Sequence, residues 1–493
     1  MADRGRRALD RRTFLKGAGA ALGGAALAGC SSPAARPAGG EGRRRRPNIV
    51  YILADDLGYH ELGCYGQEKI RTPNIDRLRA RGMKFTDHYA GSPVCAPSRC
   101  TLLTGKHTGH AWIRNNGLVR KEGQAPIPSR EPTVAEVLKE AGYATACIGK
   151  WGLGYPGSEG DPLNQGFDRF FGFNCQTLAH NHYPRFLRRN REKVFLEGND
   201  GGPSGKQYAP DLFRDEALEF IRENKDRPFF LYYATTLPHL ALQVPEDSLK
   251  EYLGKWPDPP YEGGRGYFPC KHPRATYAAM VTRMDSHVGE ITALLERLGL
   301  AGDTVIFFAS DNGATFGRVG GSDSFFFESN APLRGFKASV YEGGIRVPMI
   351  AVWPGKIRPG TVTHLPSAFW DVMPTLAEIA GVDAPGGIDG ISFLPTLLGR
   401  PAAQERHEYL LWDYPGRGGQ VAVRMGRWKG VKRGLKKNPG APLELYDLEV
   451  DVGEARDVAA SHPEIARKIG KIMVQGRTRA PLKRSRFWKY GGG

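Results

Sequence analysis

The sequence predicts an α/β fold in which a mostly parallel sheet is flanked by helices. Two observations lead to this prediction: short apolar runs alternate with amphipathic segments, and polar residues follow each apolar run directly. The length of the chain is a third observation that bears on the fold. A chain of 493 residues can bury a large core, and we expect one large domain together with a smaller one.

Apolar runs typical of buried strands occupy residues 47–54, 143–148, 229–234 and 304–309. Amphipathic helices are predicted between and after them, over residues 74–81, 134–140, 215–224 and 276–298. In sheets of this kind, ligands bind beyond the carboxyl ends of the strands. Because each of the four runs ends in polar groups, the sequence predicts one crevice to which all four strand ends contribute.

The C-terminal third predicts a smaller second unit. A further strand at 347–353 and a helix at 370–380 precede a stretch rich in glycine and proline, which marks a boundary. Short strands follow at 409–412, 421–424 and 428–431, and a helix lies near 463–476. The predicted organisation is therefore a main domain over 47–384, a linker over 385–404 and a subdomain over 405–485.

The N-terminus predicts export rather than fold. Residues 11–16, Arg-Arg-Thr-Phe-Leu-Lys, resemble a twin-arginine signal, and the small apolar residues after them are too few to span a bilayer. Leu-Ala-Gly-Cys at 27–30 resembles a lipobox, which predicts a lipid on Cys30; the alternative is a plain signal-peptide cysteine. We expect a signal over 1–30, a disordered tether over 31–46, and a periplasmic or cell-surface protein held to the membrane by its lipid.

The net charge and the cysteine content limit the classes of function and of structure that the sequence allows. The formal net charge is +17, but residues 1–47 contain eleven basic and three acidic groups, so the remainder keeps +9. That moderate excess suits an anionic substrate, and with no nucleic-acid-binding motif in view we expect no nucleic-acid partner. Apart from Cys30 and Cys95, five cysteines remain, an odd number without metal-type spacing, so no disulfide framework is predicted.

One stretch, residues 92–105, combines a nucleophile with features of an anion site. Pro97 and Ser98 favour the start of a helix and Gly105 favours its end, which places Cys95 just before a helix N-terminus. Free backbone N–H groups favour an anion there, and Arg99 adds a cation one turn further on. The alternative is an ordinary buried cysteine in front of a helix.

Two strand ends supply oxygen ligands. Asp55 and Asp56 follow the first strand, and Asp311 and Asn312 follow the fourth. Carboxylate and amide oxygens suit Ca²⁺ or Mg²⁺, and a shell of about seven oxygens favours calcium. Taken alone, an Asp-Asp pair would more often be a solvated turn, so the metal site depends on the two strand ends acting together.

Cys-Ala-Pro-Ser-Arg at 95–99, followed by Thr104-Gly105, resembles the signature of the type I sulfatases of the alkaline-phosphatase superfamily. The resemblance extends over about 47–460 and includes Leu-Tyr-Asp-Leu at 445–448, in a tail that resembles the family's small subdomain. It implies an alkaline-phosphatase-like main domain and a C-terminal α+β subdomain on an antiparallel sheet. It also implies that a maturation enzyme oxidises Cys95 to formylglycine, whose hydrate is the nucleophile.

The resemblance implies roles for the other site residues. The implied Ca²⁺ ligands are Asp55, Asp56, Asp311, Asn312 and the modified Cys95. The implied groups that hold the sulfate are Arg99, Lys150 in Gly-Lys-Trp-Gly-Leu-Gly, and Lys337 in Pro-Leu-Arg-Gly-Phe-Lys. His239, after the third strand, is implied to give a proton to the leaving group.

Gly152 departs from the family pattern, because many relatives have a histidine at this point that is thought to expel the sulfate. His180 and His182 are the candidate replacements. They are equally compatible with substrate contacts or with plain loop residues.

The predicted function is a sulfatase that hydrolyses sulfate esters of carbohydrates, or aryl sulfates, to an alcohol and inorganic sulfate through a formylglycine-sulfate intermediate with Ca²⁺. Two alternatives remain: a phosphate or phosphonate ester hydrolase on the same scaffold, and a non-catalytic lipoprotein that binds sulfated glycans, which Gly152 motivates. Substrate choice is expected to depend on the loops 155–210 and 240–275, which contain no recognisable motif.

Overall fold

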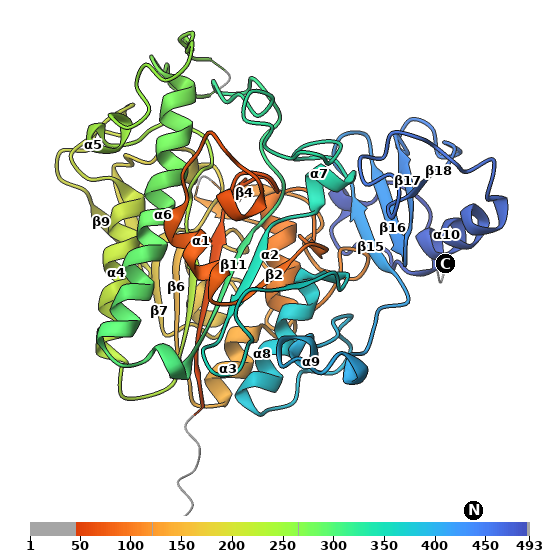
Figure 1. Ribbon diagram of the computed structural model, residues 1–493, viewed down its shortest axis with the longest axis horizontal. Coiled ribbons are helices and arrows are strands. Elements are labelled where there is room, and N and C mark those ends of the chain that lie inside the picture. The colour runs from red at the N-terminus through yellow and green to blue at the C-terminus, as the bar shows by residue number, and fades with distance from the viewer. Residues whose placement is uncertain (1–45, 121, 265, 491–493) are drawn as a thin grey trace, which may run out of the picture. The chain divides into compact units, whose positions relative to one another are not determined.

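A computed structural model describes residues 46–120, 122–264 and 266–490. Its main feature is a ten-stranded sheet in the order β13-β2-β12-β11-β1-β10-β6-β7-β8-β9 (Figure 1). The five central strands run parallel to one another: β11 (Thr304–Ser310), β1 (Asn48–Ala54), β10 (Phe229–Ala234), β6 (Ala144–Lys150) and β7 (Arg169–Phe173). The α/β prediction is confirmed.

The register of the parallel strands brings their carboxyl ends into line. Ala54 of β1 pairs with Ser310 of β11, and Ala234 of β10 pairs with Gly149 of β6. The residues that follow these strands therefore emerge at the same edge of the sheet, as the sequence predicts.

Antiparallel strands at both margins make the sheet mixed. On one side lie β12 (Met349–Val352), β2 (Met83–Phe85) and β13 (Thr361–Thr363), of which β12 runs antiparallel to both β11 and β2. On the other side, β8 (Phe186–Arg189) and β9 (Glu192–Phe195) form a hairpin beside β7.

The strands β7, β8 and β9 lie in 155–210. The expectation of a loop over this range was wrong, for two physical reasons. The hairpin is charged and half exposed, so it lacks the pattern of a buried strand. Within β7, Gly172 interrupts the apolar run, because a Cβ at this residue would lie 1.9 Å from the Gly149 carbonyl oxygen.

Helices cover both faces of the sheet (Figure 1). One face carries α1 (Pro73–Ala80), α4 (Ala209–Glu223) and α6 (Pro273–Arg297), and the other carries α2 (Cys95–Thr104), α3 (Val134–Glu140) and α8 (Val372–Ala380). Strand β1 serves both cores, since Val50 and Ile52 join the first while Tyr51 joins the second. Helices α4 and α6 begin earlier than predicted, because each accommodates a proline in its first turn.

The C-terminal part is built on a four-stranded antiparallel sheet, which confirms the predicted subdomain architecture. Its strands are β15 (Leu410–Tyr414), β16 (Gln420–Met425), β17 (Trp428–Arg433) and β18 (Glu444–Asp447), and α10 (Pro463–Gln475) packs against them. An aromatic cluster that includes Tyr89, Trp370 and Trp412 joins this sheet to the main domain. The Trp412 indole N–H also donates to the Ala90 carbonyl oxygen, 2.9 Å away.

The remaining short strands and α-helices are β3 (His88–Tyr89), β4 (Leu118–Arg120), β5 (Gly123–Gln124), α5 (Glu246–Leu249), α7 (Glu342–Ile345), β14 (Ser367–Ala368) and α9 (Leu394–Leu397). Over the described residues, no helix combines the length and apolar character needed to cross a bilayer. The six cysteines of that part of the chain are free. The predicted signal over 1–30, the lipid on Cys30 and residues 31–45 of the predicted tether lie outside the described residues.

Candidate active site

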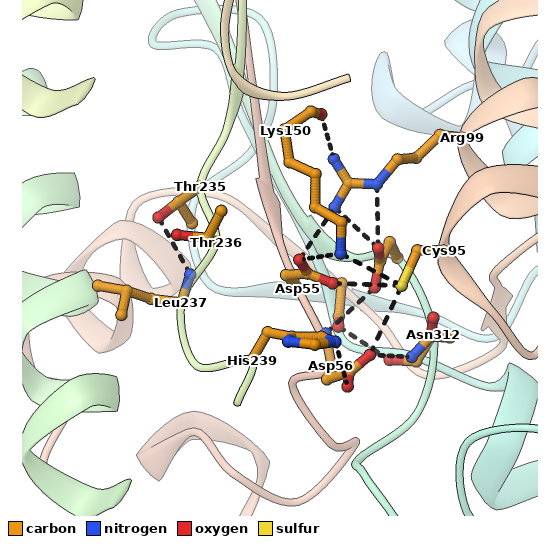
Figure 2. Close-up of polar contacts among 12 residues, drawn as sticks. Asp55, Asp56, Cys95, Arg99, Lys150, Thr235, Thr236, Leu237, His239 and Asn312 are labelled. Carbon is orange, nitrogen blue, oxygen red and sulfur yellow. Dashed lines mark hydrogen bonds and ion pairs between the residues drawn. The ribbon is translucent and has the colours of Figure 1, made fainter. Parts of the chain in front are cut away.

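The predicted site residues meet at the carboxyl edge of the sheet, as Figure 2 shows. They come from different elements: Asp55 and Asp56 follow β1, Lys150 ends β6, His239 follows β10, Asp311 and Asn312 follow β11, and Cys95 and Arg99 lie on α2. All of these residues are almost completely buried.

Helix α2 places Cys95 at the centre. The helix begins at Cys95 itself rather than just after it, and it ends at Thr104, where Gly105 caps it with a left-handed φ of 68°. The thiol Sγ lies 3.4 Å from Asp55 Oδ1, 3.5 Å from Lys150 Nζ and 3.6 Å from Lys337 Nζ. Burial raises the pKa of the Cys95 thiol, so the unmodified side chain stays protonated at neutral pH.

Three carboxylates pair with three cations around this thiol. Asp55 Oδ2 accepts from Lys150 Nζ at 2.6 Å and Asp56 Oδ2 accepts from Lys337 Nζ at 2.7 Å. Burial disfavours both carboxylate charges, but Lys150 and Lys337 outweigh it and hold the pKa of each carboxyl below its usual value. The two acids are therefore ionised and offer charged oxygens.

Arg99 and Asp311 form the third pair. Arg99 donates from Nη2 to Asp311 Oδ2 at 2.8 Å, and its Nη1 donates to the Lys150 carbonyl oxygen. The guanidinium thus fixes Asp311 and the end of β6 in place, and its part in holding the sulfate stays a prediction. Burial, reinforced by the Asp55 charge, raises the pKa of Asp311 to about 7.

The oxygen groups fit a hard divalent cation. The ligand atoms of Asp55, Asp56, Cys95 and His239 lie within 4.8 Å of one another. Asn312 donates from Nδ2 to Asp56 Oδ1 at 2.8 Å, and its own Oδ1 is buried without a hydrogen-bond partner. That open acceptor and the two ionised carboxylates form a donor set suited to Ca²⁺ or Mg²⁺.

The predicted ligand Asp311 lies outside that four-residue group. Its Oδ1 accepts the Asp56 backbone N–H at 3.1 Å, and its Oδ2 accepts from Arg99. Both oxygens of Asp311 therefore already have partners.

His239 is held as a neutral acceptor. Its Nδ1 lies 2.5 Å from the Leu240 carbonyl oxygen, which can only accept, so this nitrogen carries the hydrogen. Its Nε2 then accepts from Lys337 Nζ at 3.1 Å. Burial and the Lys337 charge lower the pKa of His239 to about 4. The hydrogen of the bond between Lys337 and His239 therefore belongs to Lys337.

The structure separates the two histidines proposed to compensate for Gly152. His180 stacks on His239 with 4.7 Å between ring centroids and on Tyr267 with 5.7 Å, so it lies at the site. Burial, to which the Lys150 and Lys337 charges add, holds the pKa of His180 far below its usual value. His182 contacts the His239 carbonyl oxygen through Nε2 and Thr236 through Nδ1, so its two nitrogens are used within the fold.

Sequence reasoning missed several polar residues of this region. Thr315 donates from Oγ1 to Asp56 Oδ2 at 2.6 Å, and Asn174 and Gln176 follow β7. Asn174 and Gln176 could have been predicted from their position directly after a parallel strand, but that strand, β7, was not recognised in the sequence. Asp56 also has a left-handed backbone with φ of 65°, an uncommon conformation that often marks functional sites.

Comparison with known proteins matches residues 47–382 to the family model described as Sulfatase, and residues 336–478 to the model for N-sulphoglucosamine sulphohydrolase, C-terminal. The chain is 36% identical to N-acetylgalactosamine-6-sulfatase of Rattus norvegicus over 378 residues, covering 72% of this chain and 67% of that protein. It is 33% identical to arylsulfatase A of Homo sapiens over 481 residues, covering 87% of each. The crystal structure of Ps i-CgsB in complex with k-i-k-neocarrahexaose superposes with a TM-score of 0.72 at 28% identity, covering 87% of this chain and 92% of that one.

Proposed function

Because the chain belongs to the sulfatase family and is therefore a sulfuric ester hydrolase, we propose that it cleaves sulfate esters of carbohydrates with a formylglycine at position 95 and a Ca²⁺ ion. The observation that carries the proposal is the position of the Cys95 thiol, which contacts Lys150 and Lys337 beside two ionised carboxylates. A maturation enzyme supplies the oxidation at Cys95, and Mg²⁺ is the alternative cation.

The residues present fit both groups. Asp55, Asp56 and the open Oδ1 of Asn312 would hold the cation, which supplies positive charge against the sulfate oxygens when bound. The hydrated aldehyde supplies a hydroxyl nucleophile where an unmodified Cys95 has only a protonated, buried thiol.

The two lysines hold the sulfate. Asp55 keeps the pKa of Lys150 above its usual value and Asp56 does the same for Lys337, although burial opposes both, so the two ammonium groups stay charged. Each lies within 3.6 Å of Cys95 Sγ, which places positive charge where oxygens of the transferring group gather. Arg99 keeps Asp311 and the end of β6 in position behind them.

Lys337 and His239 serve the leaving group. When the S–O bond breaks, the alcohol oxygen takes the bonding electrons and needs a proton. Lys337 holds that proton, and the His239 Nε2 that accepts its hydrogen bond orients the ammonium group. His180, neutral and stacked on His239, contributes a wall of the approach to this pair.

Carbohydrate substrates are proposed from the relatives. One relative is an N-acetylgalactosamine-6-sulfatase, and a structural relative binds a neocarrahexaose. The excess of basic residues outside the N-terminal segment suits an anionic substrate of this kind. We further propose twin-arginine export and a lipid anchor at Cys30, which would place the enzyme in the periplasm or at the cell surface.

Two measurements test the function. In protein from the native host, the tryptic peptide 85–99 should have the mass of formylglycine at position 95, and an unmodified thiol there would contradict the proposed nucleophile. Hydrolysis of sulfate esters should be faster than that of the matching phosphate esters. The reverse order would favour a phosphate or phosphonate ester hydrolase, and binding of sulfated glycans without release of sulfate would favour the non-catalytic lipoprotein.

A further inference from the structure

A fifth parallel strand brings two carboxamides to the edge of the active site. Strand β7 pairs in parallel with β6, so that Phe173 lies opposite Lys150. Asn174 therefore follows β7 at the edge where the other strand ends deliver their site residues, and Gln176 comes two positions later. Their side chains are buried, with exposed fractions of 2% and 5%.

These carboxamides have no hydrogen-bond partners. The two nitrogens and the two oxygens, Asn174 Nδ2 and Oδ1 and Gln176 Nε2 and Oε1, are all buried without one. Buried polar atoms in folded proteins are nearly always paired, because an unmade hydrogen bond destabilises the fold. Two whole carboxamides left open at the edge of an active site therefore indicate a ligand that completes them.

Gly152 leaves the space that the Gln176 carboxamide occupies. A Cβ at residue 152 would lie 2.0 Å from Gln176 Nε2 and 3.9 Å from the Cβ of Ala96, the residue next to Cys95. Gly152 also has φ of 93°, which side chains rarely adopt. The neutral carboxamide thus lies in the space between Gly152 and Ala96, where the loop after β6 has no side chain of its own.

The chemistry of the pair specifies its ligand group. A sulfate has only acceptor oxygens, so it would satisfy the two NH₂ groups and leave Oδ1 and Oε1 unpaired. In addition, Lys150 and Lys337 already direct their ammonium groups at the place of the sulfate, so its oxygens have other donors. The group that completes a carboxamide must both donate and accept, as a hydroxyl or an acylamino group does.

We propose that Asn174 and Gln176 form a subsite for a neutral hydroxyl or acylamino group on the sugar ring that carries the sulfate ester. The proposal rests on the proposed function and adds to it the part of the substrate that is recognised. It makes the enzyme a carbohydrate sulfatase rather than an aryl sulfatase, since a simple aryl sulfate has no such group to offer.

The test compares two substrate classes in matched variants. Gln176→Met and Asn174→Leu keep the side-chain size and remove the polar atoms. Their kcat/KM should fall roughly tenfold or more on sulfated hexose and hexosamine monosaccharides and change less than about twofold on 4-nitrophenyl sulfate. Thr177→Ala, an exposed position in the same loop, should leave both rates unchanged. The melting temperature of the two variants should stay the same or rise, because each substitution removes unpaired buried atoms.

A second arm removes the group from the sugar instead of from the protein. On a deoxy analogue of the best monosaccharide, or on one without its acylamino group, the wild type should lose the same factor as Gln176→Met, and the variant should lose nothing further. The analogue that produces this result identifies which group the pair binds.

Several outcomes would overturn the subsite. Equal losses on sugar and aryl sulfates would place the pair at the reaction centre, and no loss on either would mean that it holds only internal water. A drop in melting temperature that accompanies the loss would indicate a structural function. Wild-type activity on aryl sulfates but on no sugar sulfate would also refute it, whereas no activity on any sulfate ester would refute the proposed function instead.

Discussion

Two buried clusters with the same number of acidic and basic side chains have different functions in this molecule. The first is the active centre, with Asp55, Asp56 and Asp311 against Arg99, Lys150 and Lys337. The second, here the interface cluster, joins the main domain to the C-terminal sheet with Asp87, Glu342 and Glu454 against Arg346, Arg424 and Lys429. Each has three carboxylates and three cations, so charge content alone does not distinguish a reaction centre from a structural junction.

The difference lies in the neutral groups around the charges. At the interface, the Tyr89 hydroxyl donates to Glu342 and the Glu342 backbone N–H donates to Glu454, so the neutral groups complete the ion pairs. At the active centre, the Cys95 thiol touches two lysines, and Asn312 Oδ1 has no partner. An acceptor left open on a neutral side chain, Asn312, together with a thiol between two lysines, is what distinguishes the active centre from the interface cluster.

Replacing Cys95 should produce the largest effect on activity. Cys95→Ala removes the proposed nucleophile and should lower kcat by roughly 10⁴-fold or more, while the melting temperature changes little. Cys95→Ser keeps one hydroxyl, which accepts the sulfuryl group as the alcohol leaves but has no second hydroxyl to expel it, so the intact mass should increase by one SO₃ group after a single turnover. Repeated turnover by the serine variant would contradict the need for a second hydroxyl at position 95.

The same substitution made in both clusters should separate chemistry from stability. Lys150→Met should reduce kcat/KM by roughly 10²–10³-fold, because it removes a cation that faces the transferring group. Lys429→Met leaves Glu342 and Glu454 buried without their shared cation, and should lower the free energy of unfolding by about 3–5 kcal/mol. Denaturant unfolding and steady-state kinetics on both variants provide the comparison. A folded Lys429→Met protein with strongly reduced kcat would show that the two clusters are not separate.

Each cluster contains one carboxyl with a raised pKa, and we expect calcium to change the titration of only the carboxyl in the active centre. Burial raises the pKa of Asp311 and of Glu454 to about 7, from ordinary values of 3.8 and 4.5. Both bind their proton more tightly in the folded chain than in the unfolded chain. The stability that these two carboxyls contribute in the metal-free protein should therefore be fully present below about pH 4, fall as the pH rises from 4 to 7, and fall no further above that range.

Two changes divide this pH dependence between the clusters. Ca²⁺ bound near Asp311 should remove its share, and Glu454→Gln should remove the other, each worth about 3–4 kcal/mol between pH 4 and 8. Urea unfolding at a series of pH values, with Ca²⁺ and with EDTA, measures both. A calcium effect that depends on Glu454 would contradict the assignment.

The sequence predicted the parts of the site that depend on local pattern and on parallel topology. Asp55, Lys150 and Asp311 directly follow or end apolar strands, so their convergence follows from the rule that parallel strands end at one edge. Asn174 and Gln176 escaped prediction because their strand contains Gly172 and pairs with an exposed, charged hairpin. The contacts of Arg99 with Asp311 and of His239 with Lys337 join residues far apart in the chain and depend on packing that no local pattern encodes.

The substitution with the smallest expected effect tests the function of the unpaired carboxamides and changes no charged residue. In Gly152→Ala, the new Cβ would displace the Gln176 carboxamide, and the left-handed backbone adds strain of about 1–2 kcal/mol. Gly142→Ala is the matched control, because Gly142 has a similar φ of 87° and nothing within 4 Å of its Cβ position. Both variants should lose similar stability, and only Gly152→Ala should lose about tenfold in kcat/KM on a sugar sulfate. Equal kcat/KM values for Gly152→Ala and Gly142→Ala would mean that the unpaired carboxamides near Gly152 do not take part in function. The distinction between the two clusters would then rest on the Cys95 thiol and Asn312 alone.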